Sequence, residues 1–158
     1  PADSDVTANY TIPASSLSSF STYDTSNAYV DSDGGLYNWY TATAGTGTTT
    51  LSTDGQNTTV SICPRGWRLP TGGNSGEFQT LYNNYPSSSA LRSNPVNFNL
   101  SGNVYNSSRY GQGSYGYYWP STVYSYLYAY YLRLSTSHAG SAGNNNKYYG
   151  YSVRCIAR

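Results

Sequence analysis

Apolar residues recur with the spacing of an α-helix in one stretch of the chain. They occupy positions i, i+3, i+4 and i+7 of that stretch, namely Phe78, Leu81, Tyr82 and Tyr85. Residues with this spacing lie on one face of a helix and bury that face in a core. Asn74 or Ser75 can cap such a helix, and Pro86 ends it. The pattern therefore predicts one helix over about residues 75–85.

Alternation of apolar and polar residues predicts short strands elsewhere. It is clearest at residues 96–100, where every second side chain is apolar. Alternation of this kind is typical of a strand with one buried face. Three shorter apolar runs are also predicted to be strands, at residues 60–63, 117–119 and 149–156.

The run that follows residue 128 predicts a strand with two different faces. Leu132 and Leu134 share one face. Because side chains alternate along a strand, the opposite face carries Ala129, Tyr131 and Arg133.

Long polar stretches separate these elements and predict loops. They cover residues 43–59, 102–116 and 135–147. Loops of this length in a small domain are usually functional. The pattern as a whole predicts the α+β class, with short, mostly antiparallel strands, one clear helix and long irregular loops. We expect an irregular N-terminal segment, residues 1–34, packed on a domain formed by residues 35–158.

The composition of the chain is unusual for a domain of 158 residues. Charged residues make up 9%, against about 25% in an average soluble domain, and aromatic residues make up 16%, with 20 tyrosines. So many tyrosines exclude a disordered charged tail, because their burial offsets the entropy lost on ordering. The low content of Glu, Lys and Leu excludes a coiled coil. No apolar run is long enough to span a membrane as a helix, so no membrane insertion is expected.

Charge is unevenly distributed along the chain. All seven acidic residues lie at or before Glu77, and six of the eight Lys and Arg residues follow it. This segregation indicates either a mildly cationic C-terminal surface or chance in a chain with few charges. In both cases residues 78–158 cannot supply a carboxylate for a metal ion or for acid–base catalysis. The net charge of +1 is too small to indicate nucleic-acid binding.

The two cysteines, Cys63 and Cys155, are predicted to form a disulfide. A polar surface with few charges, rich in Tyr, Ser, Thr, Asn and Gly, is typical of secreted proteins, in which disulfides persist. Two buried free thiols remain the alternative. A bridge would close a long loop and stabilise the fold by about 4–5 kcal/mol in the chain-entropy model. With His138 as the one histidine, the cysteines cannot complete a zinc site without carboxylates.

Other signatures of catalysis or metal binding are weak. The segment from Asp31 to Asp33 and the two following glycines begins like a calcium loop but lacks the later ligands, so a turn is preferred and calcium stays open. His138 lies in a polar loop, and no G-x-S-x-G or glycine-rich phosphate-binding motif occurs. Glu77 is explained by its place at the start of the predicted helix. We therefore expect no enzyme activity and no cofactor.

Tyrosine is concentrated in the C-terminal third of the chain. Between Tyr105 and Tyr151 lie 13 of the 20 tyrosines, interleaved with Ser, Asn and Gly. A small domain cannot bury all these rings, and exposed Tyr among small polar residues is the composition of an antibody paratope. The pattern favours a recognition surface. A self-association surface, or a low-complexity surface without a role, is the alternative.

Several motifs occur in an order that resembles a known family. They are Gly35-Leu-Tyr-Asn-Trp39-Tyr40, Cys63-Pro-Arg-Gly-Trp67-Arg-Leu-Pro-Thr71, Gly76-Glu-Phe, Tyr118-Trp119-Pro-Ser-Thr122 and Tyr151-Ser-Val-Arg-Cys155. Together they resemble the Fibrobacter succinogenes major paralogous domain family of bacterial surface proteins, over about residues 35–156. The Trp-Arg-Leu-Pro-Thr segment also looks like the formylglycine-generating-enzyme branch of the C-type lectin fold. The resemblance implies a C-type-lectin-like domain.

The C-terminal third also resembles the variable proteins of diversity-generating retroelements. In those proteins adenine mutagenesis of Asn codons gives residues such as Tyr, Ser, His and Thr on a C-type lectin scaffold, where they bind ligand. Such residues dominate 115–151, although Asp, another product of Asn codons, is absent. By this likeness the ligand-binding residues are Tyr124, Ser125, Tyr126, Tyr128, Tyr130, Arg133, His138, Asn146, Tyr148 and Tyr149.

The resemblance limits the chemistry as well. C-type lectins that bind sugars hold calcium with carboxylates in their late strands, and this chain has none there. The formylglycine-generating enzymes use a cysteine pair that this chain is expected to use as a disulfide. The expected function is therefore non-catalytic binding of a protein or glycan on another cell or phage, by a domain at the cell surface or outside the cell. The alternatives are a structural or assembly module and, less favoured, a degenerate enzyme of the formylglycine-generating class.

The chain begins at Pro1, with no start Met and no signal peptide. The segment containing Cys-Trp-Met that the family usually carries upstream is also missing. We therefore expect a processed or truncated piece, with any targeting or anchoring segment outside it.

Overall fold

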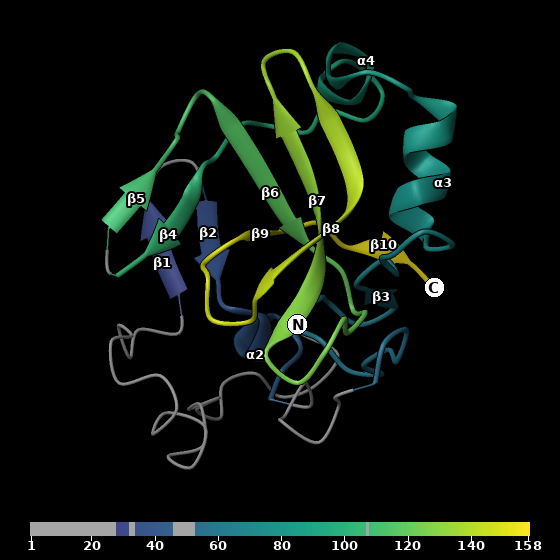
Figure 1. Cartoon of the computed structure of the whole chain (residues 1–158), viewed down its shortest axis with the longest axis vertical. Helices are drawn as coiled ribbons and strands as arrows, with labels where there is room; N and C mark the ends of the chain where they lie inside the picture. Colours follow the sequence, from purple (N-terminus) through teal and green to yellow (C-terminus); the bar gives the residue numbers. More distant parts are fainter. Residues whose placement is uncertain (1–27, 32–33, 46–52, 107) are drawn as a thin grey trace.

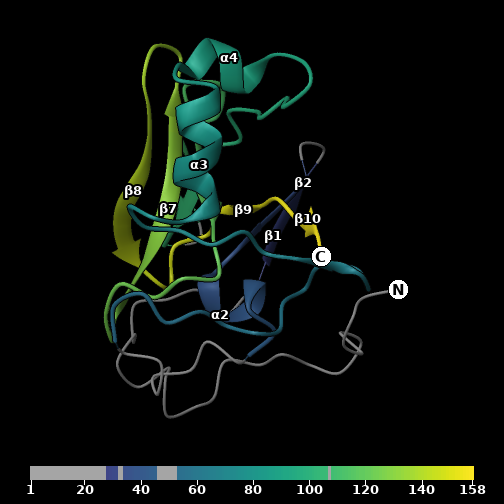
Figure 2. The same cartoon turned by 90° about the vertical axis from the view of Figure 1, so that its right-hand side faces the viewer.

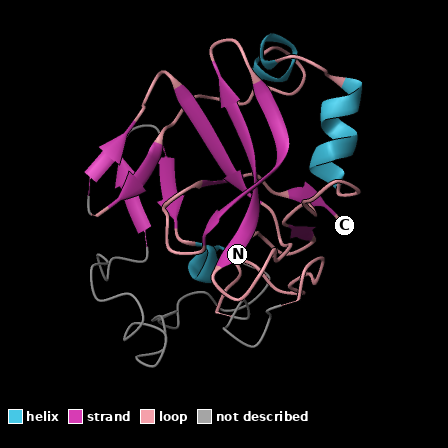
Figure 3. Ribbon diagram, in the orientation of Figure 1, coloured by secondary structure: helices cyan, strands magenta, loops and turns pink. Residues whose placement is uncertain are grey.

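A computed structural model describes residues 28–31, 34–45, 53–106 and 108–158. Short strands in small sheets make up most of the described secondary structure, and helices are few (Figure 3). The class is α+β, as the sequence pattern predicts. The predicted irregular segment 1–34 lies mostly outside the described residues.

The centre of the fold is a four-stranded sheet with strand order β8-β7-β6-β9 (Figure 1). Strands β6, β7 and β8 are antiparallel, whereas β9 runs parallel to β6. These strands are β6 (Tyr115–Trp119), β7 (Tyr128–Ser135), β8 (Ala139–Asn146) and β9 (Ser152–Val153).

Three antiparallel ribbons of two strands surround this sheet. They pair β1 (Ala28–Asp31) with β2 (Gly34–Tyr37), β3 (Trp67–Arg68) with β10 (Ile156–Ala157), and β4 (Asn103–Tyr105) with β5 (Ser108–Tyr110). The β1–β2 and β4–β5 ribbons lie on the left in Figure 1, and the long helix lies on the right. The sheet therefore lies between the helix on one side and short ribbons on the other.

That long helix, α3 (Glu77–Asn84), confirms the helix predicted from the apolar spacing. It packs against β8 (Figure 2), and its Phe78 shares a buried cluster with Leu132 and Leu134 of β7. Its N-cap is Gly76 rather than Asn74 or Ser75. Because Gly76 has no side chain to cap the helix, the Thr71 hydroxyl accepts a hydrogen bond from the Glu77 N–H at 2.9 Å instead.

Two short helices were not predicted. Asn38 caps α2 (Trp39–Ala42) by accepting from the Thr41 N–H at 2.8 Å. Ser87 caps α4 (Ser88–Arg92) by accepting from the Ala90 N–H at 3.0 Å. Both are single turns that depend on a side-chain cap and on burial, and neither is long enough to show helical periodicity.

The central sheet separates two clusters of buried apolar residues. The first cluster packs the sheet against α3 and α4, and it contains Phe78, Leu91, Phe98, Leu100, Tyr118, Leu132 and Leu134. The second lies on the opposite face beside α2, and it contains Trp39, Ala42, Cys63, Leu69, Trp119, Val123, Ala129 and Tyr151. This division confirms the two faces predicted for the strand after residue 128.

Two predicted loops contain strands. Most of 135–147 is β8, whose apolar content is too low to signal a strand; its pairing with β7 defines it. Likewise, 102–116 holds the β4–β5 ribbon and the first residues of β6. In the third predicted loop, Thr43 and Ala44 are buried and the described residues 53–57 are exposed.

Three predicted strands are absent or shorter than expected. Residues 60–63 form no strand, and 149–156 contains only β9 and the first residue of β10. At 96–100 the burial alternates as predicted, yet no strand forms there. Asn97 has φ 53°, outside the strand region, and the Tyr118 hydroxyl bonds both backbone groups of Asn99.

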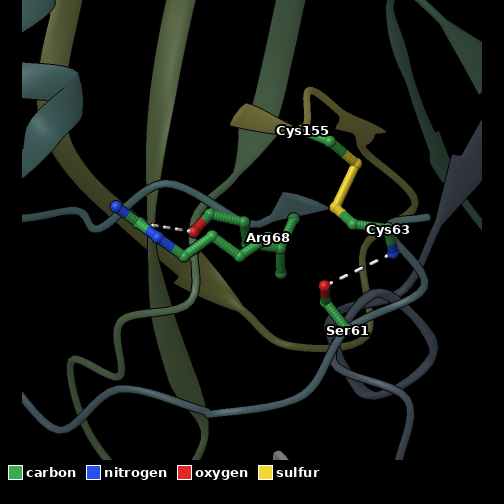
Figure 4. The surroundings of a disulfide bond; sticks show 5 residues. Ser61, Cys63, Arg68 and Cys155 are labelled. Carbon is green, nitrogen blue, oxygen red and sulfur yellow. Dashed lines mark hydrogen bonds between the residues drawn. A yellow bond between two sulfur atoms is a disulfide. The ribbon is translucent and has the colours of Figure 1, made fainter. Parts of the chain in front are cut away.

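The predicted disulfide between Cys63 and Cys155 is present, with the two Cα atoms 5.8 Å apart. Figure 4 shows it beside Arg68, with the Cys63 N–H donating to the Ser61 hydroxyl at 3.3 Å. Of the possible calcium loop, Asp31 is the last residue of β1 and pairs with Gly34, the first residue of β2, whereas Asp33 lies outside the described residues. Among the residues that the structure describes, no helix has the length and apolar character needed to cross a membrane.

Candidate ligand-binding surface

Six tyrosine rings form a continuous strip on the sheet face opposite α3. Each ring contacts another ring of the set directly or through the buried ring of Tyr151. We call this set the tyrosine strip: Tyr105, Tyr115, Tyr117, Tyr131, Tyr148 and Tyr149.

The register of the sheet places these rings together. Residues Tyr115 and Tyr117 are on β6, where they share a face with Trp119, and Tyr117 pairs with Arg133 of β7. Because directly paired residues point to the same side of an antiparallel sheet, Tyr131 and Arg133 share this face. The face is buried at Trp119 and becomes increasingly exposed toward Tyr115.

The other rings come from outside the β6–β7 pair. Tyr149 stacks on Tyr105 of β4, with ring centroids 4.9 Å apart, and on Tyr148 at 5.5 Å. The buried Tyr151 connects the two parts of the strip. Its ring centroid lies 4.8 Å from that of Tyr117, on which it stacks, and 5.9 Å from that of Tyr149. Ring stacking across separate elements makes this surface rigid.

The hydroxyls of two strip tyrosines, Tyr117 and Tyr149, remain protonated at neutral pH. Burial raises the pKa of Tyr117 and of Tyr149 above the usual value of a tyrosine. Burial also raises the pKa of Tyr151, whose hydroxyl accepts a hydrogen bond from Asn145 Nδ2 at 2.7 Å. A neutral phenol both donates and accepts hydrogen bonds, so the half-exposed rings offer apolar area with polar edges.

One cation is held at the exposed end of the strip. The guanidinium of Arg133 lies 5.0 Å from the centroid of the Tyr115 ring, in a cation–π contact. Arg133 also lies directly opposite Tyr117 in the β6–β7 register. This arrangement fixes a charged group beside the aromatic surface without neutralising it.

The structure distributes the ten predicted ligand-binding residues over two regions. Arg133, Tyr148 and Tyr149 belong to or adjoin the tyrosine strip, and His138 lies in the turn between β7 and β8 beside Arg133. The other region lies at the opposite end of β7, and its predicted members are Tyr124, Ser125, Tyr126, Tyr128, Tyr130 and Asn146.

The second region is a tight turn with two exposed rings. The backbone N–H groups of Tyr124 and Ser125 both donate to the Tyr128 carbonyl, at 3.1 and 3.0 Å. Tyr124 and Tyr126 are 41% and 47% exposed. These rings are available to a partner, but the alternation of β7 points Tyr128 and Tyr130 to the sheet face that carries Leu132.

Tyr130 differs from the other tyrosines of this region because its side chain is buried. Its ring packs on Tyr124 at 5.4 Å, and its hydroxyl donates to Asp54 Oδ1 at 2.8 Å. Burial, assisted by the Asp54 carboxylate, raises the pKa of Tyr130 to about 12. These contacts give Tyr130 a structural role that anchors the segment around Asp54 to the sheet.

Comparison with protein families, with curated proteins and with solved structures finds no match for this chain. Assignment to a function therefore depends on the residues and their geometry.

The ten predicted residues omit four members of the tyrosine strip: Tyr105, Tyr115, Tyr117 and Tyr131. Period-two alternation from Arg133 points to Tyr131, since the two residues share a strand face. Tyr117 and Tyr115 require the β6–β7 register, and Tyr105 requires a contact between β4 and the segment after β8. Local sequence carries no signal for those contacts.

Metal-ligating and acid–base side chains are sparse among the described residues. They contain no group of three or more His, Cys, Asp or Glu side chains that could hold a metal ion. His138 has its Nδ1 hydrogen bonded to the Ser137 hydroxyl at 2.8 Å. No carboxylate follows Glu77 in the sequence, so the sheet strands cannot complete a Ser-His-acid arrangement by themselves.

Proposed function

We propose that this protein is a non-catalytic recognition domain that binds its partner through the tyrosine strip and Arg133. The observation that carries the proposal is the continuous row of half-exposed rings on one rigid sheet face. Tyrosine supplies large contact area at a low entropy cost, because its ring is rigid and has few rotatable bonds. An apolar surface of this extent in a protein with few charges otherwise favours aggregation.

A C-type-lectin-like fold of the Fibrobacter succinogenes paralogous type is part of the proposal. Its support is the order of the motifs together with the positions of their residues. Trp39 and Trp119 are both buried and donate through Nε1 to Pro120 and Tyr37 carbonyls, each at 2.8 Å. The Trp-Arg-Leu-Pro-Thr segment ends at Thr71, a short turn before α3 begins at Glu77, and both cysteines of the motifs form the disulfide.

Diversification by a retroelement explains why Tyr, Ser and Asn are concentrated in one third of the chain. On this proposal the exposed and half-buried members of the ten residues named from the sequence are variable, whereas buried residues, including Tyr130, belong to the constant scaffold. Trp119, Ala129 and Leu132 are fully buried, whereas Tyr124, Tyr126 and most other members of the ten are exposed or half-buried. Substitution at exposed positions leaves the core intact.

The proposed place of action is outside the cell or at its surface, where the partner is a protein or glycan of another cell or of a phage. The disulfide supports an oxidising compartment. The charge-poor surface rich in Tyr, Ser and Asn suits recognition through adaptable hydrogen bonds.

Genomic comparison tests the diversification part of this proposal. The gene's neighbourhood is sequenced for a reverse transcriptase and a template repeat, and paralogous genes of the same genome are aligned. We expect substitutions concentrated between 124 and 149, over a constant scaffold. Invariance of the ten residues in all paralogues would contradict diversified recognition and favour the structural or assembly role.

A binding experiment tests the surface directly. Wild type is compared with a variant carrying Tyr131→Ser and Tyr148→Ser on an array of glycans and on intact bacterial cells. Trp67→Ser is the matched control, because Trp67 is 45% exposed on β3, outside the strip. We expect binding to fall at least tenfold in the double variant and to persist in the control. Equal binding by all three proteins, or concentration-dependent self-association lost in the double variant, would contradict the proposal.

A further inference from the structure

A small depression lies at the exposed end of the tyrosine strip. Its volume is about 230 Å³, and all its lining residues belong to the hairpin of β7 and β8: Tyr131, Arg133, His138, Ala139, Gly140 and Gly143. Drug-sized ligands occupy pockets of about 300–1,000 Å³, so this depression fits a smaller group. A single monosaccharide residue is of that size.

The floor of the depression is the ring of Tyr131, which lies over Gly143 because glycine has no side chain. A Cβ atom added at Gly143 would lie 2.5 Å from Cζ of Tyr131, so the Tyr131 ring covers this glycine. The Tyr131 ring also makes an edge-to-face contact with the Tyr117 ring, with the two ring centroids 5.7 Å apart. A flat, half-exposed aromatic face is a stacking surface for the C–H groups of a sugar ring.

The walls of the depression are basic. The guanidinium of Arg133 is held over the Tyr115 ring, and a planar guanidinium binds a carboxylate through two parallel hydrogen bonds. His138 uses Nδ1 in its contact with Ser137, so Nε2 is the ring nitrogen left for a ligand. The segment from residue 78 to the end contains no Asp or Glu, so every charged group that these strands supply is a cation.

We propose that this depression binds one acidic sugar residue, whose carboxylate pairs with Arg133 and whose ring stacks on Tyr131. The inference rests on the proposed recognition function and names the chemistry of the ligand. A sugar fits better than an acidic peptide, because the lining forms a short pocket within one hairpin. An extended peptide needs a longer groove or a strand edge to pair with.

Gly140 provides a substitution that closes the depression without disturbing the fold. It lies opposite Arg133 in the β7–β8 register, and a Cβ added there meets no heavy atom within 4 Å. Its backbone is not left-handed, so a β-branched residue suits this strand position. Gly140→Val therefore fills the space that the sugar would occupy.

The ¹⁵N-labelled protein is titrated with four probes, and binding is measured from the changes in its amide chemical shifts. The probes are glucuronic acid, glucose, N-acetylneuraminic acid and the methyl ester of N-acetylneuraminic acid. We expect the two acids to shift the amide signals of Gly140 and Gly143 with millimolar affinity, and glucose and the ester to bind at least tenfold more weakly. Gly140→Val and Arg133→Gln are each expected to weaken acid binding at least tenfold.

Arg65→Gln is the matched control for the loss of charge. Arg65 is exposed in the turn before β3, outside the depression, so this variant is expected to bind the acids like wild type. The shift dispersion of each variant in the absence of ligand shows that it is folded.

The possible outcomes separate this inference from the proposed function. Equal binding of glucose and glucuronic acid, equal binding of N-acetylneuraminic acid and its methyl ester, or unchanged binding by Gly140→Val would each overturn the acidic-sugar site. If the domain still binds cells or glycans through the tyrosine strip, the recognition function stands without it. If Tyr131→Ser with Tyr148→Ser also leaves all binding unchanged, the recognition function itself fails.

Discussion

The ring of Tyr131 can lie across β8 only because residue 143 has no side chain. A Cβ at Gly143 would come within 2.5–2.7 Å of the outer atoms of this ring, whereas a Cβ at Gly140 would meet nothing. The two glycines are three positions apart on the same strand, yet only Gly143 is required by packing. Glycine at 143 thus contributes to the shape of the proposed binding surface.

The contrast gives a prediction for two alanine variants. Gly143→Ala forces the Tyr131 ring away from Tyr117, and we expect it to lower stability by about 1–2 kcal/mol, as overpacking does. Gly140→Ala is expected to change stability by less than about 0.5 kcal/mol, like other surface substitutions. Urea unfolding followed by circular dichroism measures both. A loss as large at 140 as at 143 would show that the strand cannot tolerate a side chain at either position.

Lys147 is a buried charged residue. Among the described residues it is the one charged side chain that is fully buried, with Nζ donating to the Tyr126 carbonyl at 3.0 Å and lying 4.8 Å from the Trp39 ring centroid. Burial lowers its pKa from 10.5 to about 8. A lysine at this position therefore costs stability while it is charged.

The second prediction concerns the pH dependence that follows from Lys147. Between pH 8 and 10.5 the unfolded chain keeps the proton that the folded protein has lost, so stability rises with pH in this range. We expect a gain of about 1.5 kcal/mol between pH 8 and 9.5, because the slope approaches 1.36 kcal/mol per pH unit only above the folded-state pKa. In Lys147→Met this gain is expected to disappear. Urea unfolding of both proteins at several pH values provides the measurement, and equal slopes would assign the pH dependence to other groups.

At the scale of the element, α3 is fixed by one acidic residue in its first turn. Glu77 accepts two hydrogen bonds from the Arg68 guanidinium, both 2.6 Å, and a third from the Thr71 N–H at 2.9 Å. The hydrogen bonds from Arg68 hold the pKa of Glu77 below its usual value. One carboxylate thus connects β3, the segment after it and the start of α3.

The third prediction tests this connection with Glu77→Gln. Because the folded-state pKa of Glu77 is lowered, its contribution is present at neutral pH and is lost as the pH falls below 4.5. Both partners are partly exposed, so we expect a loss of only about 1 kcal/mol at pH 7, shrinking toward zero in acid. Arg68→Gln serves as the second arm of a double-mutant cycle. Strictly additive losses in that cycle would show that the pair does not interact.

The elements that sequence predicts best are those whose burial is encoded locally. The spacing of apolar residues predicts α3, and alternation places Leu132 and Leu134 opposite Tyr131. Strand β8 carries no such signal, since Ala, Gly, Ser and Asn are paired into the sheet by β7 rather than by their own burial. The same limit applies to the tyrosine strip, because the contact of Tyr105 with Tyr149 joins residues far apart in sequence.

At the scale of the molecule, the two faces of the central sheet differ in how far they are buried. The face toward α3 is buried along β7 by Leu132 and Leu134, which makes it scaffold. The other face is buried beside α2 and open at Tyr115 and Arg133. A core on both sides of the sheet lets the open end present tyrosines without loss of packing, which explains how a small domain tolerates so many exposed rings.

The disulfide links the two ends of the segment that forms this sheet. The fourth prediction concerns the stability of the protein without it. Cys63 and Cys155 are 92 residues apart, and the loop between them contains every strand from β3 to β9. Cross-linking a loop of that length stabilises by about 4–5 kcal/mol in the chain-entropy model, against a total stability of about 5–15 kcal/mol for a typical domain. Cys63 also belongs to the core beside Trp119, so its replacement loses packing as well.

We therefore expect the protein with Cys63→Ala and Cys155→Ala, like the reduced wild type, to lose most of its stability. Near-ultraviolet circular dichroism follows the ordered tyrosines of the strip during thermal unfolding. The oxidised protein is expected to give one cooperative transition, and the reduced protein a transition far lower in temperature or none at 37 °C. Oxidised protein treated with iodoacetamide without a reductant, which leaves the disulfide intact, is the control for the reagent. A reduced protein with an unchanged transition would mean that the two cores hold the tyrosine strip without the bridge, and that the domain does not need an oxidising compartment.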